Sequence, residues 1–235
     1  MRTNSVPSVA IVTGASRGLG RAIAAGLAEA GWSLVLDARG APALTEAAAR
    51  LPARPPGRVV ALPGDLIDPD HRARLVAVAT ELGGPDLVVN NAGALGPSPL
   101  PRLADLPLPA FRELLEVNVV GLLGLTQLAL PGLRQHEGGV LNITSDAAVE
   151  AYEGWGGYGA SKAAVEQLGR VLAVEEPDVR VWWADPGDLR TRMHQDAFPG
   201  EDIGDRPLPE TVVPAVLKLL ATRPESGRVR LRELL

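Results

Sequence analysis

Three side chains in the second half of the sequence could together move a proton. Tyr158 and Lys162 are four residues apart, and Ser145 lies thirteen residues before the tyrosine. Residues i and i+4 share one face of a helix, so the phenol and the ammonium can point into one pocket. A free tyrosine has a pKa of about 10, and a neighbouring cation favours the phenolate and lowers that pKa. The alternative is an ordinary surface pair on an alanine-rich helix, because Tyr-x-x-x-Lys is a common spacing.

A glycine-rich turn near the N-terminus is the second feature with chemical meaning. Gly14, Gly18 and Gly20 lie where a predicted strand at residues 8–13 runs into a predicted helix at residues 19–30. Glycines permit a tight turn and a close backbone approach to a ligand. The helix N-terminus behind them offers unpaired N–H groups and a positive dipole end, which suit a pyrophosphate. The alternative is a glycine-rich turn that binds no ligand.

The elements that must position these residues alternate between strands and helices. Short β-branched apolar runs predict strands at residues 8–13, 33–37, 58–62, 87–90, 140–144, 179–184 and 228–231. Alanine- and leucine-rich stretches predict helices at residues 19–30, 42–51, 69–82, 108–135, 158–175 and 210–221. Strands that alternate with helices pair in parallel, and strands without polar alternation are covered on both faces. The predicted fold class is therefore α/β, a doubly wound parallel sheet in three layers, as one domain over residues 1–235.

Composition limits the classes of protein to which this sequence can belong. Hydrophobic residues make up 46% of the 235 positions, and the net charge is −5 without a basic block. This charge argues against a nucleic-acid partner or an anionic membrane surface. There is no cysteine, and the three histidines lack metal-ligand spacing, so we expect no disulfide and no metal site. Because no signal peptide or transmembrane run is evident, we expect a cytoplasmic protein without a membrane partner.

The predicted helix at residues 108–135 is apolar almost all round in its second half. A helix on one face of a sheet normally keeps a polar side, so this one is expected to bury its outer face against another subunit. Simple enrichment in leucine is the alternative. The pattern predicts a homo-oligomer.

Six motifs, taken together, resemble those of the short type of short-chain dehydrogenases/reductases. They are the turn with the spacing G-x-x-x-G-x-G, Asn90-Asn-Ala-Gly93, Asn118, Ser145, Tyr158-x-x-x-Lys162 and Pro186-Gly187, in the order and spacing of the family. The resemblance covers nearly the whole chain. It implies a Rossmann-type NAD(P)-binding fold with strand order 3-2-1-4-5-6-7, assembled as a homodimer or homotetramer. The sequence lacks the glycine-rich ending usual after the last strand, which leaves open the subunit contacts that such a tail makes.

The resemblance also implies catalytic roles. Tyr158 would be the general acid in carbonyl reduction or the base in alcohol oxidation, and Lys162 would lower its pKa and hold the nicotinamide ribose. Ser145 would polarise the substrate oxygen, and Asn118 would hold a water in a proton relay. The alternatives are a helix-cap or turn role for Ser145 and a buried structural amide for Asn118.

The contacts with the cofactor follow from the same resemblance. They are expected from Gly14, Ser16, Arg17, Gly18, Leu19, Gly20, Asp37, Arg39, Asp65, Leu66, Asn91, Ala92, Gly93, Tyr158, Lys162, Pro186, Gly187 and Thr191. Asp65 and Leu66 match the position that contacts adenine. Residues 91–93 would lie beside the adenosine ribose, and residues 186–191 match the segment that closes over the nicotinamide and the pyrophosphate.

The end of the predicted second strand bears on which dinucleotide binds. In this family an acidic residue there selects NAD, whereas basic residues nearby select NADP by pairing with its 2′-phosphate. The usual acidic position falls on Ala38, between Asp37 and Arg39, and Arg17 lies in the glycine-rich turn. Two guanidinium groups against one carboxylate favour NADP(H). A shift of one residue in register would favour NAD(H) instead.

The substrate is expected to lie between the serine and the tyrosine and under a mobile loop at about residues 188–209. Tyr152 and Trp155 fall in the first segment and Phe198 in the second, and their proximity to the site suggests an apolar or cyclic substrate. His194 either contacts substrate or is a solvated loop histidine.

The predicted function is NADP(H)-dependent interconversion of a carbonyl and a secondary alcohol on a small or cyclic organic substrate. The alternative is a non-catalytic NADP(H)-binding redox sensor. A sensor has no need of the complete set of catalytic residues, which argues for the enzyme.

Overall fold

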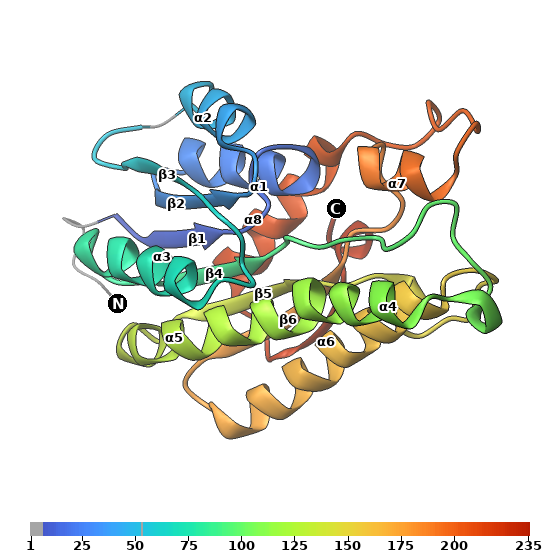
Figure 1. Cartoon of the computed structure of the whole chain (residues 1–235). Helices are drawn as coiled ribbons and strands as arrows, with labels where there is room; N and C mark the ends of the chain where they lie inside the picture. The colour runs from blue at the N-terminus through green and yellow to red at the C-terminus, as the bar shows by residue number, and fades with distance from the viewer. Residues whose placement is uncertain (1–6, 53) are drawn as a thin grey trace.

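The computed structural model describes residues 7–52 and 54–235, and its centre is one seven-stranded parallel sheet (Figure 1). The strands are β1 Val9–Val12, β2 Ser33–Ala38, β3 Val59–Pro63, β4 Leu87–Asn90, β5 Gly139–Ile143, β6 Arg180–Asp185 and β7 Gly227–Arg230. They lie in the order β3-β2-β1-β4-β5-β6-β7, which confirms the prediction. The direction of winding reverses between β1 and β4, and ligands of open α/β sheets bind at the carboxyl ends of the strands beside such a point.

In the part of the chain that the structure describes, eight α-helices connect and cover these strands. They are α1 Gly18–Glu29, α2 Ala41–Ala49, α3 Pro69–Glu81, α4 Leu108–Leu115, α5 Gly121–Gln135, α6 Gly156–Glu175, α7 Arg192–Ala197 and α8 Val213–Thr222. Local sequence explains several of their ends. Asp68 caps α3 by accepting the Asp70 amide, with Pro69 in the first turn. After α1, Gly31 turns the chain with a φ of +86°, a conformation that favours glycine.

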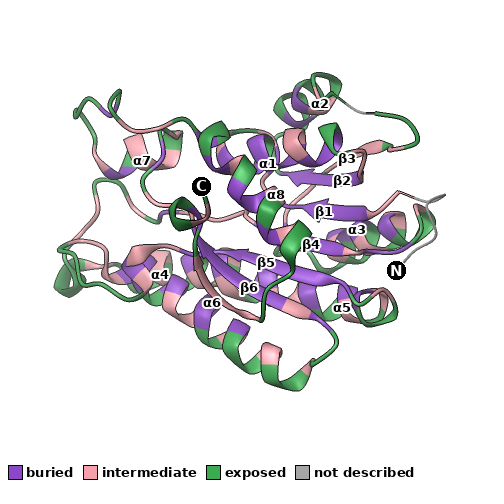
Figure 2. Cartoon of the chain, turned by 180° about the vertical axis from the view of Figure 1, so that it is seen from behind, coloured by how far each residue is buried: buried purple, intermediate pink, exposed green. Residues whose placement is uncertain are grey.

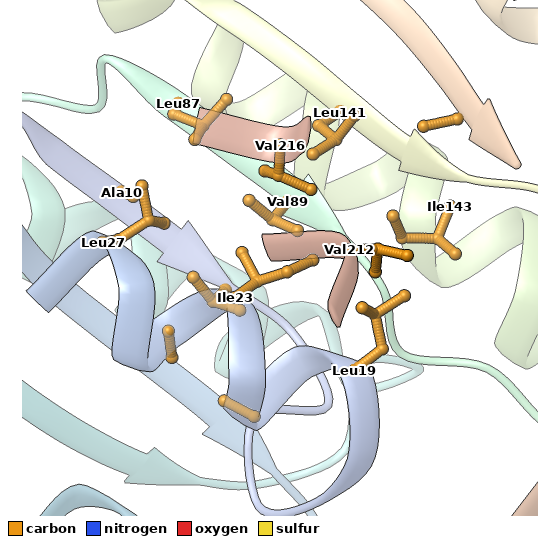
Figure 3. Close-up of a cluster of buried hydrophobic side chains, with 14 of the residues drawn as sticks. Ala10, Leu19, Ile23, Leu27, Leu87, Val89, Leu141, Ile143, Val212 and Val216 are labelled. Carbon is orange, nitrogen blue, oxygen red and sulfur yellow. The ribbon is translucent and has the colours of Figure 1, made fainter. Parts of the chain in front are cut away.

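Alternate side chains of each strand enter two hydrophobic cores, one on each face of the sheet. Ala10 and Val12 of β1 pack with α1 and α8, whereas Val9 and Ile11 pack with α3 and α5. The central strands are buried between helices whose outer sides are exposed (Figure 2). Figure 3 shows the first core, with side chains of α1 against those of the central strands. The strands lack polar alternation because both of their faces are buried.

Residues 108–135 form one helical segment, as predicted, but a π-helical turn at Glu116–Val120 joins α4 to α5. By length and composition alone this segment could cross a membrane, since an 18-residue window has a mean hydropathy of 1.5. No transmembrane run is expected from the sequence, so this segment departs from that expectation in length and hydropathy. Buried residues of α5, among them Leu125 and Leu133, pack in the second core with the sheet. Val120 and Leu128 are exposed.

The remaining differences from the predicted elements concern short helices. The predicted loop at residues 188–209 contains α7, whose N-cap Thr191 accepts the amide of His194 at 3.2 Å. Single turns of 3-10 helix occur at Leu103–Asp105, Asp146–Ala148, Pro209–Val212 and Leu231–Leu234, of which Pro209–Val212 overlaps the first turn of the helix predicted at residues 210–221. The other segments, of three to six residues, are too short to show a helical hydrophobic period, which is why the sequence did not predict them as helices.

Candidate active site

The glycine-rich turn follows β1 and is braced by the residue after β4. Gly14 and Gly18 have φ values of +65° and +55°. A Cβ on Gly20 would lie 2.4 Å from the Gly14 carbonyl oxygen, so the backbone could not approach this closely with a side chain there. The side-chain amide of Asn91 donates to the Thr13 carbonyl oxygen at 2.9 Å. The backbone N–H of Asn91 donates to the Thr13 hydroxyl at 3.0 Å. These contacts fix the start of the turn against the residue after β4.

The N-terminus of α1 opens onto this turn. Arg17, at the N-cap, makes no side-chain bond to the first-turn amides, which remain available together with the helix dipole. Arg17 is exposed, Ser16 is half-buried, and Leu19 packs in the core. A Cβ on Gly18 would lie 3.6 Å from the Thr191 methyl group, so the segment after β6 approaches the turn. The cradle therefore fits the pyrophosphate of a dinucleotide.

Asp37, the next-to-last residue of β2, has its carboxylate turned into the protein. Its Oδ1 lies 2.7 Å from Nε2 of His71 on α3, and both residues are buried. Burial raises the pKa of the Asp37 carboxyl, against the opposing effect of the His71 bond. Arg39, two residues later, is exposed. Arg17, in the turn after β1, and Arg39, after β2, are both exposed, and contact between Asp37 and the ribose stays a prediction.

The predicted adenine contacts lie at the carboxyl end of β3, beside β2. Asp65 is half-buried, and its Oδ1 accepts the Ile67 amide at 3.2 Å. Leu66 is buried, and its carbonyl oxygen accepts a hydrogen bond from Arg72. A Cβ on Gly121 would lie 3.1 Å from that carbonyl, so the start of α5 packs directly against it.

Tyr158 and Lys162 lie on the same face of α6, both buried, with the lysine Nζ 5.6 Å from the centre of the tyrosine ring. The Lys162 ammonium donates to the carbonyl oxygen of Ile143, at the end of β5, at 2.8 Å. Gly93, after β4, lies beside it, since an added Cβ would be 3.7 Å from Nζ. The structure therefore brings together the predicted residues of α6 and of the loops after β4 and β5.

The pKa values of this pair differ from the expectation. Burial lowers the pKa of the Lys162 ammonium to about 8. Burial, helped by the carboxylates of Asp146 and Asp185, raises the pKa of Tyr158. The expectation that Lys162 lowers the pKa of the tyrosine is wrong for this structure. The physical reason is that the ammonium bonds to the Ile143 carbonyl, while loss of water and two carboxylates act on the phenol.

Ser145 follows β5 and caps the short turn Asp146–Ala148. Its hydroxyl accepts the Ala147 amide at 3.2 Å and donates to Oδ1 of Asp146 at 2.9 Å. The predicted cap role is observed. Within residues 7–52 and 54–235, the Tyr158 hydroxyl has no hydrogen-bond partner, so it is available to a substrate. Asp146 was not singled out from the sequence, although its place next to the serine was a usable signal.

Asn118 lies in the π-helical turn and is a fully bonded buried amide. Its Oδ1 accepts the Ala94 amide at 2.7 Å. Its Nδ2 donates to the Ala94 carbonyl at 2.9 Å and to the Ser161 hydroxyl at 2.9 Å. The structural alternative is therefore observed, and the water-holding role stays a prediction. The π-turn, which is frequent at functional sites, lets this amide join the loop after β4 to α6.

A row of rings extends from the tyrosine to α7. The ring centres of Tyr158 and Trp155 are 5.6 Å apart, those of Trp155 and Phe198 6.0 Å, and those of Phe198 and His194 4.9 Å. The side chain of His194 is 10% exposed, so the solvated-loop alternative is wrong. Tyr152, predicted to share this cluster, is 46% exposed and lies outside it.

Comparisons with known proteins agree with this geometry. The family described as short chain dehydrogenase matches residues 8–202. Sepiapterin reductase of Rattus norvegicus is 38% identical over 203 residues, which cover 80% of this chain and 76% of that protein. L-fucose dehydrogenase of Mus musculus is 34% identical over 191 residues, which cover 80% of this chain and 67% of that protein.

Solved structures extend the similarity to the whole fold. An alcohol dehydrogenase from the archaeon Thermococcus sibiricus, complexed with 5-hydroxy-NADP, has a TM-score of 0.84 at 32% identity, with 95% of each chain covered. A protein from Escherichia coli CFT073, complexed with NADPH, has a TM-score of 0.87 at 28% identity and covers 99% of this chain and 100% of its own. With the sheet order, the glycine-rich cradle and the Tyr158/Lys162 pair in place, the chain belongs to the short-chain dehydrogenase/reductase family of NAD(P)-dependent oxidoreductases.

Proposed function

We propose that the protein reduces the carbonyl group of a small or cyclic organic substrate to a secondary alcohol with NADPH, and runs the reverse reaction with NADP⁺. The observation that carries the proposal is the buried Tyr158 ring beside the Lys162 ammonium on α6. The short turn that Ser145 caps packs against Gly159, the residue after Tyr158 on α6, since an added Cβ there would lie 2.5 Å from the Ala147 carbonyl oxygen. When bound, the nicotinamide supplies the hydride, and the protein must supply the proton.

Tyr158 is proposed as the proton donor in reduction. A raised pKa keeps the phenol protonated near neutral pH, which is the form that an acid needs. The reverse reaction needs the phenolate, so alcohol oxidation is expected to become faster as the pH rises. Ser145 would orient the substrate oxygen, and for this its hydroxyl proton must turn from Asp146 towards the substrate.

The preference for NADP(H) is supported by the charges at the end of β2. Arg39 is exposed just after β2 and Arg17 is exposed in the turn after β1, whereas the Asp37 carboxylate is buried against His71. Guanidinium groups pair well with a phosphate dianion. Two structurally similar proteins were solved with NADP-type cofactors, in line with this preference.

An apolar or cyclic substrate is supported by the rings next to the tyrosine. Trp155 and Phe198 flank Tyr158 together with Leu95 and Met193. Such side chains bind apolar faces and offer few hydrogen bonds.

The test is consumption of NADPH and of NADH in the presence of a panel of ketones, quinones and aldehydes. We expect turnover with at least one compound and a higher kcat/KM for NADPH. A tenfold preference for NADH would refute the cofactor assignment. Tight NADPH binding without turnover across a broad panel would favour the redox-sensor alternative.

A further inference from the structure

Arg228 of β7 lies at the centre of a buried ionic network behind the active site. Its Nε donates to Oε1 of Glu166 at 3.0 Å, and its Nη2 donates to Oδ2 of Asp185 at 3.1 Å. The same Nη2 donates to the carbonyl oxygen of Ser145 at 3.2 Å. Glu166 is 1% exposed and Asp185 7% exposed. One guanidinium thus joins α6, the end of β6 and the residue that follows β5.

Both carboxylates of this network continue into the loops of the active site. Oδ1 of Asp185 accepts the amide N–H of Gly187 at 2.9 Å, within the turn expected to close over the nicotinamide. Oε1 of Glu166 accepts the Thr144 hydroxyl at 2.9 Å, one residue before the catalytic serine. Glu166 also lies one helical turn after Lys162 on α6.

The network depends on Arg228 because two buried carboxylates need a counter-charge. A buried ion without a partner is strongly destabilising. Arg170 also contacts Glu166, at 3.1 Å, but among the described ion pairs Asp185 is joined to Arg228 alone. A second C-terminal arginine, Arg232, donates to the Asp188 carbonyl oxygen at 2.6 Å and packs over Gly187.

We propose that Arg228 is a positioning residue, which sets where the Ser145 hydroxyl and the Gly187 turn lie relative to Tyr158. The C-terminal edge strand β7 thereby becomes part of the active site without contacting substrate. The inference rests on the proposed function, since it concerns the reaction that Ser145 and Tyr158 would serve.

Arg228 also acts on the tyrosine through charge. Tyr158 is faced by Lys162 on its own helix, by Asp146 after β5 and by Asp185 of β6, while His194 of α7 lies behind Phe198. Asp185 raises the pKa of Tyr158, and Arg228 offsets the charge of Asp185. Loss of Arg228 should therefore raise that pKa further.

The first experiment needs no ligand. In Arg228→Gln, amide hydrogen exchange in residues 185–188 is expected to become at least tenfold faster than in the wild type, because the carboxylate that accepts the Gly187 N–H loses its anchor. The matched control is Arg230→Gln, an exposed arginine of the same strand whose ion pair is with Glu233 at 3.4 Å. Equal exchange in the two variants would overturn the proposal.

The second experiment uses the carbonyl compound of the panel that the wild type reduces. Arg228→Gln should lower kcat at least tenfold and move the midpoint of the pH profile for alcohol oxidation upwards. Arg228→Lys should recover part of the rate, because an ammonium keeps the positive charge but lacks the planar set of N–H donors of a guanidinium. Asp185→Asn combined with Arg228→Gln should return the midpoint towards the wild-type pH while kcat stays low.

A merely structural role predicts a different pattern, in which Arg228→Gln lowers only the melting temperature and leaves kcat and the pH midpoint unchanged. Should Arg228→Gln not fold, Arg228→Lys replaces it, and the proposal then requires faster exchange at Gly187 and a lower kcat than in Arg230→Lys. A wild type that reduces no compound of the panel would refute the proposed function, and hydrogen exchange would still decide the role of Arg228.

Discussion

At the scale of single residues, the surroundings of Tyr158 and Lys162 shift the pKa of each side chain. Tyr158 and Lys162 are both buried, and burial acts against the charged form of each. The pKa of Tyr158 is therefore raised and that of Lys162 is lowered to about 8. In the proposed carbonyl reduction, the protonated phenol is the form that donates the proton.

The role of Tyr158 can be tested by removing its hydroxyl. Tyr158→Phe is expected to bind NADPH with unchanged affinity but to lose at least ~100-fold in kcat, the lower range of general acid–base contributions. Turnover with the best carbonyl compound and titration of NADPH by fluorescence give the two values. Activity within a few-fold of the wild type would remove Tyr158 from the mechanism.

Lys162 is expected to lower the stability of the protein without cofactor. The lowering of the Lys162 pKa from 10.5 to about 8 corresponds to a loss of about 3 kcal/mol in the free energy of unfolding. The hydrogen bond from the ammonium to the Ile143 carbonyl offsets about 1 kcal/mol of this loss. Lys162→Met should therefore raise the free energy of unfolding by about 2 kcal/mol at pH 7 while turnover is lost. Denaturant titration measures the gain, with the exposed Lys218→Met as the control.

The sign of the pH dependence follows from the lowered pKa. Between about pH 8 and 10.5 the unfolded chain binds more protons at this lysine than the folded protein does, so wild-type stability should rise with pH in that window. The advantage of Lys162→Met should then be full below pH 8 and vanish towards pH 10.5. A constant advantage at all pH values would contradict a charge effect.

At the scale of elements, the π-helical turn between α4 and α5 has a definite structural task. It places Asn118 so that one amide group binds both backbone groups of Ala94 and the hydroxyl of Ser161. The loop after β4, which contains Gly93, is thereby fixed against the helix that carries Tyr158 and Lys162. A π-helical turn contains one more residue than a regular α-helical turn, because its hydrogen bonds join residues i and i+5.

Removal of the Asn118 amide should therefore cost stability. Asn118→Ala loses three hydrogen bonds, each contributing about 1 kcal/mol, so we expect a loss of about 3 kcal/mol in the free energy of unfolding. Urea titration checks this value. A matched exposed substitution on the same segment, Gln127→Ala, should change it by less than about 0.5 kcal/mol.

At the scale of the whole molecule, exposed apolar residues gather on two neighbouring helices. The segment with α4 and α5 lies beside α6 on one face of the sheet (Figure 1). It exposes Val120 and Leu128, and α6 exposes Val171 and Val174. Exposed apolar side chains that lie together on a surface are typical of protein–protein interfaces. They support the proposal, made from the sequence, that the protein is a homodimer or homotetramer.

Sedimentation at micromolar concentration tests this assembly. We expect a particle of at least two chains, and a charge placed in the patch by Val174→Asp should shift it towards the monomer. Glu175→Lys, the next residue on α6 and also exposed, is the control for a change of charge alone. A monomeric wild type would contradict the assembly.

Much of this protein could be predicted from local sequence. The alternation of β-branched runs with alanine- and leucine-rich stretches is a local signal, and it predicted all seven strands within a residue or two of their observed bounds. The glycine-rich turn and the i, i+4 spacing of Tyr158 and Lys162 are local as well, because a turn and a helix face are set by neighbouring residues.

Contacts between distant segments were decided only by the tertiary structure. Asp37 meets His71 across 34 positions, and Arg228 meets Glu166 across 62. No local pattern pairs such residues, since it is the order of the strands that brings them together. The pKa of Tyr158 is the clearest case. Its neighbour Lys162, at i+4, predicted a lowered pKa, but burial raises it, and burial depends on every element around the side chain. The sequence determined which groups are present, and the packing of the sheet, α6 and α7 determined how strongly each holds its proton.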